Sequence, residues 1–135
     1  MRPIFLALCL ALGAGLPAGL PAAKTVVDVY YFHGRVRCMS CNRIEAYTKE
    51  AVEKRFAADV KKGRVVMHVG DLDEPANRHY IQDLQITSKT VVVVRTVDGK
   101  PETLRKLDQV WVLLRDKAKF MAYVEKNVNA AKTGA

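Results

Sequence analysis

The stretch His33-Gly34-Arg35-Val36-Arg37-Cys38-Met39-Ser40-Cys41 joins two different sequence patterns. The residues before it, 26–32, are almost all β-branched or aromatic, which is typical of a buried strand. The residues after it, 44–56, carry apolar side chains at helical spacing. Cys38 is therefore predicted to lie where a strand passes into a helix. The first turn of a helix offers unpaired N–H groups and a partial positive charge to a thiolate.

Two cysteines at this spacing can form a structural disulfide, bind a metal or act as a redox pair. A stabilising disulfide is the weakest of these interpretations, because closing so short a loop constrains the unfolded chain very little. The third cysteine of the chain, Cys9, lies in a segment that we expect to be removed. A single remaining pair in an exported protein favours redox or metal chemistry.

Residues 1–22 have the pattern of a secretory signal peptide. Arg2 supplies a positive charge, residues 4–16 form an apolar region, and small residues follow at 17–23. The apolar region is short and interrupted by glycine, which favours cleavage over a retained membrane anchor. We therefore expect cleavage near Ala22 and a periplasmic or otherwise exported protein.

The chain of 135 residues is basic, with 22 Lys and Arg, 14 Asp and Glu, and a formal net charge of +8. Half of its residues are apolar, which is enough for one compact domain. The basic residues are spread among acidic ones, and export separates the protein from chromosomal DNA, so we exclude a nucleic-acid partner. The positive surface is expected to help docking to an acidic partner or to anionic lipid headgroups.

The rest of the sequence alternates between strand and helix patterns in the order β-α-β-α-β-β-α. This order predicts an α/β fold with a four-stranded mixed sheet and helices on both faces. Two crossovers through helices imply neighbouring parallel strands, and Asp98-Gly99 predicts a hairpin that adds an antiparallel edge. One domain over 24–129 is expected, followed by a frayed tail at 130–135. The expected strands are 25–32, 64–69, 90–97 and 102–107, and the expected helices are 39–58, 75–84 and 116–129.

The strand, the short loop, the CxxC motif at a helix start and this element order together resemble the thioredoxin-like superfamily. The similarity covers 25–129 and includes Val69-Gly70-Asp71-Leu72-Asp73-Glu74, Gln85-Ile86-Thr87-Ser88-Lys89-Thr90-Val91 and Asp98-Gly99-Lys100. More narrowly, Tyr30-Tyr31-Phe32-His33-Gly34, Arg37-Cys38 and Cys41-Asn42-Arg43-Ile44-Glu45 resemble small exported thioredoxin-like proteins known as nitrophenyl-compound nitroreductase subunits, associated with arsenic-resistance gene clusters.

The resemblance implies that Cys38 is the attacking thiolate and that Cys41 is the resolving thiol one turn inside the helix. Physical reasoning agrees, because a helix N-terminus with Arg35 and Arg37 nearby is expected to lower the pKa of Cys38. We predict a thiol–disulfide oxidoreductase that exchanges electrons with protein thiols or disulfides and needs no organic cofactor. A membrane electron donor is the expected supplier if the protein acts as a reductant.

The sequence departs from the thioredoxin pattern just before the third expected strand. Thioredoxins carry a cis-proline there, facing the disulfide, whereas this chain has Ser88 and Lys89, which we expect to lie opposite the CxxC. A polar residue at this place leaves room for a metal. The alternative hypothesis is therefore a soft-metal or metalloid module, in which Cys38 and Cys41 bind copper(I), zinc or arsenic and His33 assists.

Four further residues could belong either to a site or to the ordinary framework of the fold. Asp28 either lies near the exposed start of its strand or is buried behind the cysteines as a proton acceptor. His68 and His79 are interpreted as structural or surface residues, and Trp111 as a core residue.

Overall fold

The computed structural model describes residues 19–135. The predicted signal peptide, 1–22, lies outside the described residues except for 19–22. Within the described part of the chain, every helix is too short or too polar to cross a bilayer.

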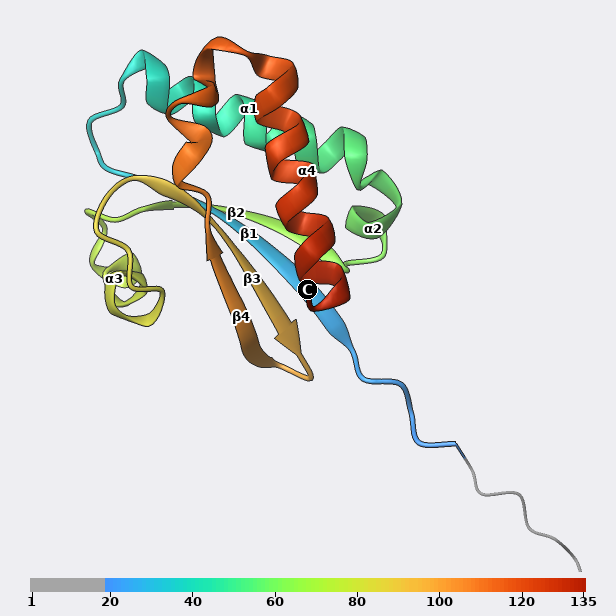
Figure 1. Ribbon diagram of the computed structural model, residues 1–135. Coiled ribbons are helices and arrows are strands. Elements are labelled where there is room, and N and C mark those ends of the chain that lie inside the picture. The colour runs from blue at the N-terminus through green and yellow to red at the C-terminus, as the bar shows by residue number, and fades with distance from the viewer. Residues whose placement is uncertain (1–18) are drawn as a thin grey trace, which may run out of the picture.

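A four-stranded mixed sheet with the strand order β2-β1-β3-β4 lies at the centre of the molecule (Figure 1). β1 pairs in parallel with β2 and antiparallel with β3, and β3 pairs antiparallel with β4. The predicted four-stranded mixed sheet is therefore confirmed. The strands are β1 (Thr25–His33), β2 (Val65–Asp71), β3 (Thr90–Val97) and β4 (Lys100–Lys106).

The direction of β3 differs from the prediction of two parallel crossovers. Phe32 in β1 lies opposite Gly70 near the end of β2 and opposite Thr90 at the start of β3. The chain therefore leaves β2 and enters β3 at the same end of the sheet. The intervening helix has only five residues and does not carry the chain back along the strands, so β3 runs antiparallel to β1.

Helices cover both faces of the sheet, as predicted, with α1 and α4 on one face and α3 on the other (Figure 1). The predicted helix 39–58 is interrupted at Phe56, whose backbone leaves the helical region at φ −125°. The predicted helix 75–84 is a 3-10 turn followed by a single short helix. The arrangement is consistent with a thioredoxin-like fold. The helices are α1 (Met39–Arg55), α2 (Ala57–Lys61), α3 (His79–Asp83) and α4 (Lys117–Thr133), and the 3-10 turns are η1 (Pro75–Asn77), η2 (Asp108–Val110) and η3 (Leu113–Arg115).

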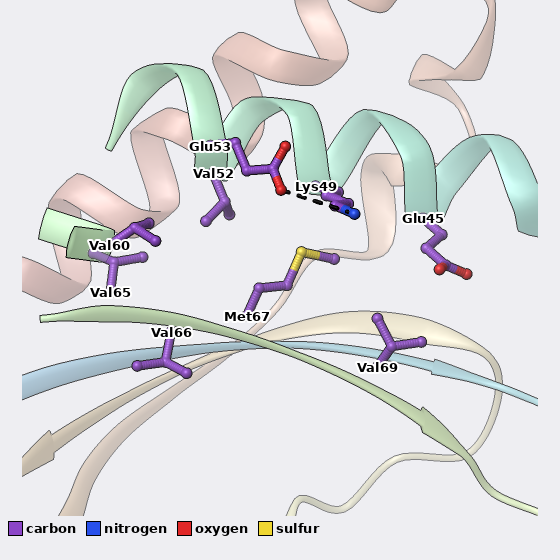
Figure 2. Close-up of a pocket in the computed structure, with 9 residues that line it drawn as sticks. All are labelled: Glu45, Lys49, Val52, Glu53, Val60, Val65, Val66, Met67 and Val69. Atoms are coloured by element: carbon purple, nitrogen blue, oxygen red, sulfur yellow. Dashed lines mark ion pairs between the residues drawn. The ribbon is translucent and has the colours of Figure 1, made fainter. Parts of the chain in front are cut away.

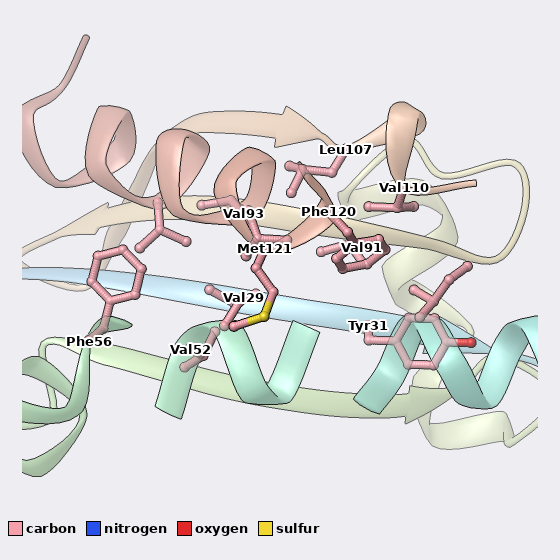
Figure 3. Close-up of a cluster of buried hydrophobic side chains, with 14 of the residues drawn as sticks. Val29, Tyr31, Val52, Phe56, Val91, Val93, Leu107, Val110, Phe120 and Met121 are labelled. Carbon is pink, nitrogen blue, oxygen red and sulfur yellow. The ribbon is translucent and has the colours of Figure 1, made fainter. Parts of the chain in front are cut away.

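The side chains of β1 alternate between two hydrophobic clusters, because successive residues of a strand point to opposite faces of the sheet. Val29 and Tyr31 lie in the larger cluster, between the sheet and the helices α1 and α4 (Figure 3). Phe32 belongs to the smaller cluster on the α3 face. Tyr31 consequently points toward the same face as the helix that carries the cysteines.

The last helix runs further than the predicted end at residue 129. α4 continues to Thr133, and Ala131 is buried, so the predicted frayed tail over 130–135 is corrected for its first four residues. Arg95 of β3 donates from Nη1 to the carbonyl oxygens of Ala131 and Lys132 at 2.9 and 2.8 Å. These bonds act at the last turn, where helix carbonyls run short of intrahelical donors, and add to the Gly134 N–H that also reaches the Ala131 carbonyl oxygen; together they explain the longer helix.

Candidate functional site

Cys38 and Cys41 are joined by a disulfide, with their Cα atoms 5.1 Å apart. Cys38 is the N-cap of α1 and has an extended backbone, and its Sγ accepts the Cys41 backbone N–H at 3.2 Å. The prediction that Cys38 lies where a strand passes into a helix is therefore confirmed. Cys38 is exposed, whereas Cys41 has 0% of its surface exposed. An approaching partner therefore reaches Cys38 and not Cys41.

Tyr31 fixes the backbone at the buried cysteine. Its hydroxyl donates to the Cys41 carbonyl oxygen at 2.9 Å from within the core. Burial raises the pKa of Tyr31 above its ordinary value; the nearby Arg37 acts in the opposite direction, and Glu45 adds to the rise. The phenol therefore stays protonated and continues to donate this hydrogen bond near neutral pH.

The two arginines predicted to tune the thiolate lie next to carboxylates. Arg37 forms an ion pair with Glu45, nearly two turns into α1. The Arg35 guanidinium is largely exposed and lies 4.0 Å from Glu74, while its backbone N–H donates to Asp73 at 2.7 Å. Within residues 19–135, neither arginine donates a hydrogen bond to a cysteine sulfur. The neighbouring carboxylates therefore partly cancel the positive potential that the two arginines produce at the disulfide.

Lys89 is the cation that contacts the disulfide. Its Nζ lies 3.9 Å from Cys41 Sγ and donates to the Val36 carbonyl oxygen at 3.0 Å. The neighbouring Ser88 is exposed. Of the two residues predicted to lie opposite the CxxC, only Lys89 makes a recorded contact with a cysteine sulfur within the described chain.

Two residues that sequence reasoning did not assign to the site hold Lys89 in place. Trp111 donates from Nε1 to the Lys89 carbonyl oxygen at 3.2 Å and is 40% exposed, so its interpretation as a core residue was wrong. A Cβ atom at Gly34 would lie 3.3 Å from Lys89 Cε and 3.1 Å from Asp73 Oδ2. The only sequence signal for this close approach was a glycine in the short loop between β1 and Cys38.

Asp28 lies on the other face of the sheet. Its carboxylate accepts from Thr96 Oγ1 at 3.3 Å and lies 2.8 Å from His68 Nε2. In β1 it alternates with Val27 and Val29, which face α1 and α4, so Asp28 points toward the α3 side. It is therefore not a proton acceptor behind the cysteines. His68 contacts Asp28 and stacks on Tyr30, which agrees with its interpretation as a structural or surface residue.

His33, the proposed third metal ligand, makes no recorded contact with the cysteines within the described residues. Nδ1 of His33 lies 3.0 Å from the Gly34 carbonyl oxygen. Within the described residues, no group of three or more Cys, His, Asp or Glu side chains is placed to hold a metal ion. The two cysteines are therefore the soft donors that the structure brings together.

The surface around Cys38 is apolar and basic. Val36 and Met39, on either side of the motif's first cysteine, are 80% and 77% exposed. A groove of about 440 Å³ is lined by Ser40, which lies between the two cysteines in the sequence, and by Arg43, Trp111, Val112, Leu114 and Arg115. We call these residues, with Val36 and Met39, the entrance surface.

A second, more apolar groove of about 430 Å³ lies between α1 and the edge strand β2 (Figure 2). Met67 points from β2 toward α1, and the ion pair between Lys49 and Glu53 lies above it (Figure 2). Neither cysteine lines this groove.

A scan of protein-family models and a search of curated proteins find no match to this chain.

Proposed function

We propose that this protein is an exported thiol–disulfide oxidoreductase that exchanges electrons with the cysteines of partner proteins. The observation that carries the proposal is the asymmetry of the pair: Cys38 is exposed at the N-terminus of α1, and Cys41 is buried one turn inside. Such an arrangement provides one sulfur for intermolecular attack and one for intramolecular resolution.

In the reducing direction, the Cys38 thiolate attacks one sulfur of a partner disulfide. The bond between Cys38 and that sulfur forms, the partner's disulfide breaks, and its other sulfur leaves as a thiolate. Cys41 then loses its proton and attacks Cys38 Sγ. This second step re-forms the Cys38–Cys41 bond, releases the remaining partner sulfur, and completes the transfer of two electrons to the partner.

The entrance surface supports a protein substrate. Exposed apolar side chains beside Cys38 favour contact with an extended segment of another protein, and Arg43 and Arg115 favour an acidic one. Export is proposed from the signal-peptide pattern of 1–22, and the resemblance to exported nitroreductase subunits agrees with it. A membrane electron donor would re-reduce the pair if the protein acts as a reductant.

A redox titration combined with trapping tests this function. Cys41→Ser is expected to retain partner proteins as mixed disulfides through Cys38, and Cys38→Ser is expected to retain none because its remaining sulfur is buried. The wild-type pair should cycle between dithiol and disulfide in glutathione buffers. A pair that stays in one state across biological potentials, or equal trapping by both variants, contradicts the proposal.

The same purified protein distinguishes metal binding from redox exchange. Copper(I) bound with one-to-one stoichiometry in the presence of millimolar glutathione, and lost on replacing either cysteine, would assign the pair to metal or metalloid transfer instead.

A further inference from the structure

The charge of Lys89 is directed at the buried sulfur and not at the exposed one. Its Nζ contacts Cys41 Sγ at 3.9 Å and is oriented by the Val36 carbonyl oxygen at 3.0 Å. Within residues 19–135, no carboxylate lies within 4.0 Å of this ammonium group. Among the described contacts, Lys89 is thus the cation that reaches a cysteine sulfur, and it does so without an ion-pair partner.

The position of this ammonium group is built from several elements. The register of β1 with β3 places Thr90 opposite Phe32, which brings Lys89 beside the loop that follows β1. The Trp111 indole N–H donates to the Lys89 carbonyl oxygen. The Lys89 side chain passes close to Gly34, where an added Cβ atom would lie 3.3 Å from Lys89 Cε. The lysine is half-buried as a result.

The other titratable groups around Cys41 have partners of their own. The Tyr31 hydroxyl donates to the Cys41 carbonyl oxygen, and Arg37 is paired with Glu45. Asp73, across Gly34, accepts the Arg35 N–H, and His33 lies against the Gly34 carbonyl oxygen. None of these groups has a recorded contact with the buried sulfur within the described chain.

We propose that Lys89 is a catalytic residue that stabilises the thiolate of Cys41 during resolution of the mixed disulfide. The inference rests on the proposed function. With Cys38 bonded to a partner sulfur, the Cys41 thiol releases its proton to solvent and the resulting thiolate attacks Cys38 Sγ. The Cys38–Cys41 bond forms, and the partner sulfur leaves with the electron pair of the broken bond.

The electrostatic need for Lys89 follows from burial. A thiolate with no exposed surface loses most of its hydration, and burial alone favours the neutral thiol. An ammonium group in contact with the sulfur opposes that effect. Cys38 has the helix N-terminus and solvent instead, so each sulfur has its own source of stabilisation.

The first test measures the charge effect without any redox cycle. In a Cys38→Ser background, the pH dependence of thiolate absorbance reports the pKa of Cys41. Lys89→Gln keeps a hydrogen-bond donor for Val36 and removes the charge, so the pKa of Cys41 should rise by about one unit or more. Lys89→Arg should largely restore the original value. Lys126→Gln, at an exposed position of α4, should leave the value unchanged.

Gly34→Ala gives a second, independent variant in the same background. The new methyl group crowds Lys89 Cε and should displace the ammonium group, which raises the pKa of Cys41 in the same direction. If Lys89→Gln and Gly34→Ala both fold and leave the pKa of Cys41 unchanged, the proposal is overturned. If only one of them folds, an unchanged pKa in that variant overturns it.

The second test measures resolution in protein that retains both cysteines. A mixed disulfide of Cys38 with glutathione is prepared, and the release of glutathione by Cys41 is followed at pH 7. A tenfold smaller thiolate fraction is partly offset by the higher nucleophilicity of a more basic thiolate, so Lys89→Gln should slow release about threefold. At high pH, where Cys41 is fully ionised in both proteins, the order should reverse and Lys89→Gln should release glutathione up to about threefold faster than wild type.

The experiments can contradict the oxidoreductase function and the role of Lys89 independently of each other. If the wild-type pair does not cycle, the oxidoreductase function is wrong, although the Cys38→Ser titration still reports the contact between Lys89 and Cys41. If the wild type cycles and Lys89→Gln releases glutathione at the wild-type rate with an unchanged pKa of Cys41, the role of Lys89 is wrong and the oxidoreductase function stands.

Discussion

The two sulfurs of the disulfide have very different surroundings at the scale of single residues. Cys38 Sγ accepts an N–H group at the end of a helix and is open to solvent. Cys41 is closed in by the core, with the Tyr31 hydroxyl on its carbonyl oxygen and the Lys89 ammonium group at its sulfur. Position within the motif therefore decides the role of each cysteine.

Tyr31→Phe is predicted to destabilise the oxidised protein by about 1 kcal/mol, because the Cys41 carbonyl oxygen loses the hydroxyl that donates to it. Urea unfolding at neutral pH measures the change. Tyr123→Phe is the matched control, since within the described chain the Tyr123 hydroxyl makes no recorded hydrogen bond, and its free energy of unfolding should stay close to that of the wild type. Equal effects of the two variants would show that the Tyr31 bond adds nothing to the fold.

At the scale of secondary-structure elements, α4 begins and ends on side-chain contacts. Asp116 is its N-cap and accepts the Lys119 backbone N–H at 3.0 Å. This hydrogen bond, more than the nearby Lys119 side chain, holds the pKa of Asp116 below its ordinary value. The cap fixes the first turn of a helix that packs against both α1 and the sheet.

Asp116→Ala is predicted to lower Tm by roughly 4 °C at pH 7, whereas Asp116→Asn should retain most of the stability because an amide oxygen also caps. The lowered pKa fixes the sign of the pH effect. Stabilisation from the charged cap is present above the ordinary carboxyl pKa and is lost as the pH falls through the lower value in the folded state. Thermal unfolding of the three proteins between pH 2 and 7 checks this, and a gap between wild type and Asp116→Asn that does not shrink in acid contradicts it.

Local sequence patterns predicted the bounds of the long elements more accurately than those of the short ones. The strand 90–97 was predicted with its observed bounds, because a run of β-branched residues ends at an Asp-Gly turn. The helix at 75–84 was predicted too long, since apolar spacing alone does not stabilise a helix whose packing surface is small. The CxxC and its place at a helix start followed directly from the pattern.

The contact between Lys89 and Cys41 lay beyond sequence reasoning for a physical reason. It depends on β3 running antiparallel beside β1 with Thr90 opposite Phe32, which long-range pairing decides. The sequence placed Lys89 near the cysteines only through the resemblance to thioredoxins. The compensation of Arg35 and Arg37 by carboxylates depends on similar tertiary placement.

At the scale of the whole molecule, the end of the chain is tied to the centre of the sheet. Arg95 of β3 donates to two carbonyl oxygens in the last turn of α4, and Ala131 is buried against the core. The last helix is thus attached to the sheet at its C-terminal end as well as through its apolar face.

Removing 130–135 is predicted to lower Tm by several degrees, because it exposes core surface that Ala131 covers and leaves Arg95 without its carbonyl acceptors. Differential scanning calorimetry measures the effect. Arg95→Lys should show a smaller loss in the full-length chain, since it removes the guanidinium hydrogen bonds to Ala131, Lys132 and Glu102 but leaves Ala131 buried. A truncated protein as stable as the full-length one would mean that this end of the chain contributes nothing to folding.

The N-cap role of Cys38 links the oxidation state to the conformational stability of the protein. Reduction replaces a disulfide sulfur at the start of α1 with a thiolate, which is a stronger acceptor for the Cys41 N–H and is favoured by the helix dipole. By the closed thermodynamic cycle, the fold makes the pair more oxidising to the extent that it is more stable with the dithiol than with the disulfide, at about 30 mV for each 1.4 kcal/mol. Two denaturation curves, one with and one without a reductant, therefore show whether folding shifts this pair toward oxidising or toward reducing behaviour before any partner has been identified.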